Sequence, residues 1–167
     1  MKNTLQKTHT FFLQLHIVWF VLIMIPIIFL IRYFFGSILC LFNVELVNPW
    51  VNIKIHLNLF IFILLLVLFI PFAFLETTIF QYLVFKISRK IKYLEKKVIV
   101  IILISSFLFG IAHFSYDIPY QIFAFFNGIP FAYSYFVAEE KKIHPILIVS
   151  LIHYLVNVLS LSLIYIL

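Results

Sequence analysis

The sequence has few charged residues, few glycines and one cysteine, and these shortages exclude several classes of protein. Only 11% of its 167 residues are charged, and three are glycine. Soluble globular domains carry about 25% charged residues, so this composition excludes a soluble globular domain. The single cysteine, Cys40, excludes an internal disulfide.

What the sequence has instead is long apolar segments, with 65% hydrophobic and 20% aromatic residues. A membrane-spanning helix needs about 20 apolar residues, and helices satisfy their own backbone hydrogen bonds in lipid. We therefore predict an all-α fold, a polytopic membrane helical bundle with about five to seven transmembrane helices. Residues 1–70 would form N-terminal transmembrane segments, and 71–167 the remainder of a single compact membrane domain.

The first predicted span covers residues 11–31, twenty-one mostly apolar residues that end at Arg32. Residues 33–47 are also apolar but contain Glu45. They could form a tilted span, a re-entrant piece or a helix in the membrane interface. Trp50 follows, and tryptophan commonly settles at headgroup level, so we expect a membrane boundary there.

A longer apolar run at 57–85 has Pro71 in its middle, which predicts a bent helix or two abutting helices. Residues 86–97 then carry six cations and one anion. The positive-inside rule places this segment, and the N-terminus with Lys2 and Lys7, in the cytoplasm, for a protein of the plasma membrane. No nucleic-acid motif accompanies the cations, so we expect a lipid bilayer and no nucleic acid as partner.

Three further apolar segments complete the predicted bundle. Residues 98–114 would run outward, 119–137 would return, and 145–167 would run outward again. The charged loop at 139–142 would then lie in the cytoplasm. These three crossings, added to two or four crossings before residue 86, give five or seven spans.

Four polar residues in the apolar segments form a candidate site. Glu76 follows nineteen almost uniformly apolar residues, and His113 ends another apolar run. His153 and Asn157 are four residues apart, which places both on one helical face about 6 Å from each other. Ionisable residues in membrane segments usually face a cavity or a partner, so we expect these four to converge. The alternative is that each has a structural role, such as a hydrogen-bonded carboxyl or a capped helix end.

This set of residues permits two mechanisms of peptide-bond hydrolysis. Glu76 could activate a water with His113 sharing the proton, while His153 and Asn157 stabilise the oxyanion. Alternatively, Glu76, His113 and His153 could hold a zinc ion whose bound water attacks the peptide. The sequence has no His-Glu-x-x-His motif, which weakens the zinc alternative without deciding the cofactor.

Three short motifs carry a resemblance to a known family. They are Glu-Thr-Thr-Ile-Phe-Gln at 76–81, Phe-x-x-x-His at 109–113 and His-x-x-x-Asn at 153–157. In this order they resemble the motifs of CPBP proteins, the CAAX-protease or Abi family of intramembrane proteases. The resemblance implies a protease core at 71–167 that cleaves a peptide or protein substrate in or at the membrane. Its mechanism would be glutamate- or metal-dependent.

The first motif departs from the family pattern Glu-Glu-x-x-x-Arg, because Thr77 and Gln81 replace the second glutamate and the arginine. These two supporting residues are four apart, so we expect a neutral hydrogen bond in place of an ion pair. We expect a working hydrolase that retains Glu76. The alternatives are a non-catalytic membrane scaffold or bacteriocin-immunity protein with the same fold, or a small proton-coupled transporter.

Overall fold

The computed structural model describes residues 2–42 and 58–166, and every regular element in these ranges is helical. The membrane boundary that was predicted at Trp50 lies outside the described residues. Glu45, in the apolar segment at 33–47, also lies outside them. The elements in chain order are α1 (Lys2–Gln14), α2 (Ile17–Leu41), α4 (Leu59–Glu76), the π-helix η1 (Thr77–Leu83), α5 (Val84–Ser88), α6 (Val98–Ile111), α7 (Ile118–Glu140) and α8 (Pro145–Ile166). The prediction of an all-α membrane bundle is confirmed.

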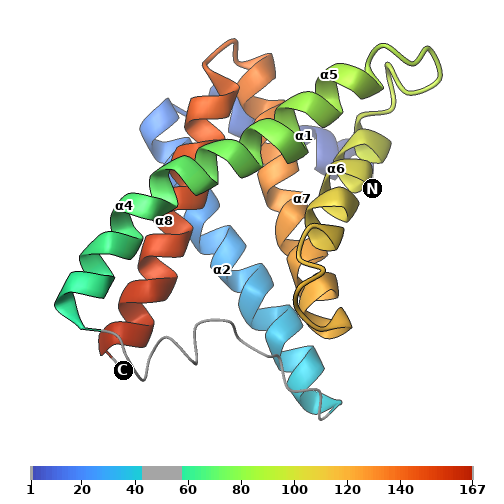
Figure 1. Ribbon diagram of the computed structural model, residues 1–167. Helices are drawn as coiled ribbons and strands as arrows, with labels where there is room; N and C mark the ends of the chain where they lie inside the picture. The colour runs from blue at the N-terminus through green and yellow to red at the C-terminus, as the bar shows by residue number, and fades with distance from the viewer. Residues whose placement is uncertain (1, 43–57, 167) are drawn as a thin grey trace.

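Helices α4 and α5 and the π-helix between them form one continuous helix, Leu59–Ser88 (Figure 1). Pro71 lies inside this helix without ending it. The run at 57–85 is therefore not two abutting helices. Its continuity keeps Glu76 within a regular helix, where neighbouring helices can contact it.

Among the described residues, three helices are long and apolar enough to cross a membrane, namely Ile17–Leu41, Leu59–Ser88 and Pro145–Leu163. Helix α6 is apolar but has only 14 residues. These helices make the chain an integral membrane protein. The total of five to seven crossings stays a prediction.

The closest helix packing joins α6 to α7, where two glycines permit the approach. A Cβ atom added to Gly110 would lie 2.9 Å from the carbonyl oxygen of Gln121, and one added to Gly128 would lie 2.9 Å from Cα of Ser106. The lack of a side chain at these two glycines therefore allows α6 and α7 to approach each other closely. This contact positions the turn after α6, which carries His113.

The hydrophobic core lies between α2, α6, α7 and α8. Its largest buried side chains from these four helices are Phe20, Met24, Ile28, Ile101, Phe131 and Ile152. Helix α4 packs mainly against α8 and exposes most of its apolar side chains. In a membrane these exposed side chains face lipid.

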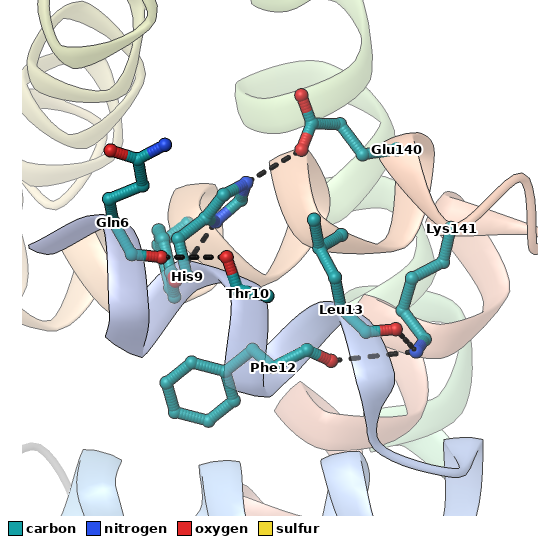
Figure 2. Close-up of polar contacts among 8 residues, drawn as sticks. Gln6, His9, Thr10, Phe12, Leu13, Glu140 and Lys141 are labelled. Carbon is teal, nitrogen blue, oxygen red and sulfur yellow. Dashed lines mark hydrogen bonds and ion pairs between the residues drawn. The ribbon is translucent and has the colours of Figure 1, made fainter.

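Helix α1 is tied to the loop after α7 by polar contacts (Figure 2). His9 Nε2 lies 2.6 Å from Glu140 Oε2, and Lys141 Nζ donates to the carbonyl oxygens of Leu13 and Leu15, each at 2.6 Å. Arg89, just after α5, pairs with Glu139. One end of the bundle thus contains the N-terminal helix, the end of α5 and the α7–α8 loop. This agrees with the prediction that all three lie on the cytoplasmic side.

Candidate functional site

A cavity of about 490 Å³ opens between α2, α4, α7 and α8 and the turn after α6. Glu76, His113, His153 and Asn157 all line it. These are the four side chains that the sequence places in one site. Three separate parts of the chain supply them, so the fold brings them together.

The carboxylate of Glu76 and the ring of His153 face each other in this set. Glu76 Oε2 lies 3.4 Å from His153 Nε2. The His153 side chain is only 5% exposed, and its ring lies 4.4 Å from that of Phe131 and 5.9 Å from that of Phe109. Aromatic packing therefore fixes the imidazole, while the half-buried carboxylate faces it across the cavity.

His113 follows α6 and is oriented by the backbone. Its Nδ1 lies 2.8 Å from the carbonyl oxygen of Phe109. Because a carbonyl only accepts hydrogen bonds, Nδ1 carries the proton, and Nε2 of the neutral ring has a free lone pair. Within the described residues no hydrogen bond or ion pair joins His113 to Glu76. The carboxylate is thus paired with His153 rather than with His113, which the sequence analysis expected to share its proton.

Asn157 lies one helical turn after His153 on α8 and lines the same cavity. The spacing of four residues puts the two side chains on one face, as predicted. In the part of the chain that the structure describes, no hydrogen bond holds the Asn157 amide. Its NH₂ group can therefore donate to a ligand in the cavity.

The expected hydrogen bond between Thr77 and Gln81 is wrong. Both side chains are buried, and Thr77 Oγ1 and Gln81 Nε2 have no hydrogen-bond partner. Residues 77–83 form a π-helix, in which each turn takes about one residue more than in an α-helix. The four-residue spacing assumed an α-helix, so it did not predict how these two side chains lie.

The expected zinc ligands do not form a metal site. Among residues 2–42 and 58–166, no group of three or more His, Cys, Asp or Glu side chains is placed to hold a metal ion. The donors of Glu76, His113 and His153 therefore do not fit zinc in this arrangement, and we derive no step through a metal.

The cavity also contains an arginine that sequence reasoning missed. Arg32 lines it, donating from Nε to Asn127 Oδ1 at 3.0 Å and from Nη1 to Ser160 Oγ at 2.8 Å. The sequence analysis treated Arg32 as the charge that ends a span, but α2 continues to Leu41. The apolar residues after Arg32 were the signal that it lies inside the helix.

Two tyrosines complete the polar wall. Tyr116 and Tyr120 both line the cavity, with ring centroids 4.7 Å apart. Tyr120 is near enough to Arg32 for an electrostatic interaction between them. Nothing in the sequence motifs pointed to these residues, because isolated tyrosines are common in membrane helices.

Comparison with known proteins identifies the family. Searches of curated proteins and of solved structures give no match. A family described as type II CAAX prenyl endopeptidase Rce1-like matches residues 56–159, well over half of the chain. The matched range contains Glu76, His113, His153 and Asn157, but it leaves out Arg32. This chain belongs to the Rce1-like family of CAAX-type membrane proteases.

Proposed function

We propose that this chain is an intramembrane endopeptidase that hydrolyses a peptide bond of a membrane-associated or secreted substrate. The observation that carries the proposal is the cavity lined by Glu76, His113, His153 and Asn157, in which Glu76 Oε2 lies 3.4 Å from His153 Nε2. A carboxylate, two imidazoles and an amide in one cavity can bind a water and a carbonyl side by side. Membership of a protease family supports the same reaction class.

In the proposed mechanism, Glu76 acts as general base on a water. The water oxygen attacks the scissile carbonyl carbon while Glu76 takes one of its protons. His113, whose Nε2 carries no proton in the assigned tautomer, lines the same cavity and would be a second base there. The proton then passes to the leaving nitrogen as the carbon–nitrogen bond breaks, giving a carboxylate and an amine.

His153 and Asn157 would stabilise the negative charge that forms on the carbonyl oxygen. The Nε2 of His153 faces the Glu76 carboxylate, a position that favours an N–H on that nitrogen. The amide of Asn157 is one turn away and has no other hydrogen bond among the described residues. In the proposed mechanism both groups would donate to this one oxygen, and losing one such donor typically costs about 10²–10³ in rate.

The apolar wall of the cavity supports a substrate that arrives from the bilayer. Leu65, Leu68 and Phe72 of α4 line the cavity. Leu68 and Phe72 are also exposed at the surface. The cavity therefore extends from the polar residues to a surface that faces lipid. We place the protein in the plasma membrane with its N-terminus in the cytoplasm, because the cationic segment at 86–97 follows the positive-inside rule.

The competing function is a scaffold or bacteriocin-immunity protein that binds a peptide without cutting it. One observation favours it: the replaced motif residues Thr77 and Gln81 are buried with unpartnered polar atoms. Purified protein in nanodiscs, incubated with a pool of membrane peptides and analysed by mass spectrometry, separates the two functions. An enzyme yields new peptide ends that disappear in Glu76→Gln, whereas a scaffold binds the pool and yields none with either protein.

A further inference from the structure

The cavity extends from the Glu76–His153 pair toward one end of the bundle. On α4 the other lining residues, such as Leu65 and Phe72, all precede Glu76, and on α8 they all follow His153. Helix α4 runs toward the end that contains α5, whereas α8 runs away from it (Figure 1). Both helices therefore place the cavity on the side away from α5 and the cationic segment at 86–97.

Helix α7 gives the same direction. Its lining residues lie between Tyr120 and Asn127, in the half that follows the α6–α7 turn. The other end of α7 carries Glu139, which pairs with Arg89 of the cationic segment. In Figure 1, α4 and α8 diverge from α2 and α7 with increasing distance from α5. The cavity thus lies where these helices separate.

The opposite side of the Glu76–His153 pair, toward the cationic segment, is tightly packed. The rings of Phe85 and Tyr135 lie 5.0 Å apart there, and neither residue is more than 3% exposed. Four more residues on this side, each at most 1% exposed, are Thr77, Gln81, Val137 and Val149. His153 is eight residues after Pro145, so about 12 Å of helix separates it from the start of α8. This packing blocks the direct route from the cationic end to Glu76 and His153.

On the cavity side, the lining residues reach the surface. The side chain of Glu76 is 34% exposed, whereas Thr77, the next residue, is 0% exposed. Tyr116 and Asn157 are half-buried, and Phe72 is 55% exposed. In the part of the chain that the structure describes, water and peptide thus reach the carboxylate through the cavity.

The distribution of charge predicts which side of the membrane the cavity faces. The segment at 86–97 carries six cations and one anion, and Lys90, Lys92 and Lys96 are exposed there. The α6–α7 turn, residues 112–117, carries one charged residue, Asp117. The positive-inside rule predicts that the cationic segment is cytoplasmic, which places the turn and the cavity beside it toward the extracytoplasmic side.

We propose that the cavity opens to the extracytoplasmic side and that the chain hydrolyses a peptide segment which has already crossed the membrane. A water from that side adds to the scissile carbonyl carbon, and the products are a new carboxylate and a new amine on the same side. A transport step must therefore supply the substrate, and a segment confined to the cytoplasm would not be cut. The inference rests on the proposed function for the cleavage and on the predicted orientation for the side.

The first test measures the accessibility of the cavity from each side of the membrane, without catalysis. In a Cys40→Ser background, which has no other cysteine, Asn157→Cys probes the cavity. We expect a small membrane-impermeant methanethiosulfonate to label this variant in intact cells. Tyr116→Cys, in the α6–α7 turn, should react in the same way, and it gives a second measurement should the Asn157 variant fail to fold.

Ser150→Cys is the matched control on the packed side. Ser150 lies on α8 seven residues before Asn157, and its side-chain oxygen is buried. It should not be labelled from either side, and Lys96→Cys should be labelled only after the cells are permeabilised. The inference is overturned if the two cavity variants react only after permeabilisation or under neither condition. Labelling of Lys96→Cys in intact cells, or of Ser150→Cys after permeabilisation alone, overturns it as well.

The second test measures cleavage by sealed membrane vesicles of both orientations. Vesicles that contain the protein are incubated with one pool of water-soluble peptides, and mass spectrometry identifies new peptide ends. We expect new ends with right-side-out vesicles, their loss with inside-out vesicles, and their return when detergent opens the inside-out vesicles. Vesicles with Glu76→Gln should yield none.

Equal or greater cleavage by the sealed inside-out vesicles would contradict the inference. Should neither orientation cut any peptide, before or after detergent, while the cavity cysteines still react in intact cells, the proposed hydrolysis fails. The extracytoplasmic opening of the cavity then stands on the labelling alone.

Discussion

Glu76 stands where α4 passes into the π-helix, and this position determines what its carboxylate can reach. A π-helical turn widens the helix by about one residue and often marks a functional site. Here the carboxylate lies in the cavity opposite His153, and not among the exposed apolar side chains of α4. The contact and the polar cavity offset part of the cost of a carboxyl group at membrane depth.

The arrangement of donors around Glu76 predicts that hydrolysis does not need a metal. No group of three metal-binding side chains forms among the described residues, and the proposed mechanism has no step that uses an ion which a chelator could remove. Treatment with EDTA or 1,10-phenanthroline should leave the rate of peptide cleavage unchanged within error. The measurement is the cleavage rate in nanodiscs before and after treatment. Loss of activity that added zinc restores would refute this prediction.

At the scale of elements, the α6–α7 contact holds His113 in place through small residues. Gly128→Val should destabilise the protein by about 1–3 kcal/mol, the usual cost of overpacking, because its Cβ would lie 2.9 Å from the Ser106 backbone. Thermal unfolding of the purified protein measures the effect. The matched control is Gly36→Val, because a Cβ atom at Gly36 meets nothing within 4 Å. Equal melting temperatures for the two variants would show that the contact is looser than described.

Helix α1 is held to the bundle by Lys141, which donates to backbone carbonyls near the end of that helix. Lys141→Met removes these charge-assisted bonds, each typically worth about 1.5–3 kcal/mol. We therefore expect faster hydrogen exchange in α1, with the exchange of α7 and α8 unchanged. Lys142→Met is the control, since Lys142 is exposed. Equal hydrogen-exchange rates of α1 in both variants would mean that the apolar face of α1 alone holds this helix to the bundle.

At the scale of the whole molecule, the contacts of α1, α5 and the α7–α8 loop define one end of the bundle (Figure 1). From the positive-inside rule we predict that this end is cytoplasmic. Cys40, near the other end of α2, should then react with a membrane-impermeant maleimide added to intact cells. In a Cys40→Ser background, Lys96→Cys should react only after the cells are permeabilised. The reverse pattern of labelling would invert the predicted orientation.

Much of the fold could be predicted from the sequence, because apolar runs long enough to cross lipid leave few choices of structure. The helices at 17–41, 59–88 and 145–163 follow these runs. The π-helix at 77–83 could not be predicted, since no residue type in it is specific for that geometry. The Thr77–Gln81 hydrogen bond that was expected for an α-helix does not form there.

The candidate site was only partly accessible to sequence reasoning. Motif spacing located Glu76, His113, His153 and Asn157, which line one cavity. It could not locate Arg32, because a cation after a long apolar run looks the same whether the helix ends there or continues. Which residues face each other across helices depends on packing, so the pairing of Glu76 with His153 also required the structure.

The most direct test of the central claim is a double-mutant cycle on peptide hydrolysis with Glu76→Gln, His153→Gln and the double variant. Residues that act on one reacting group in a shared cavity give strongly non-additive losses. We predict that the kcat/KM of the double variant is no lower than that of the more severely impaired single variant. Losses in kcat/KM that multiply in the double variant would mean that the two residues act independently, which contradicts a single catalytic cavity.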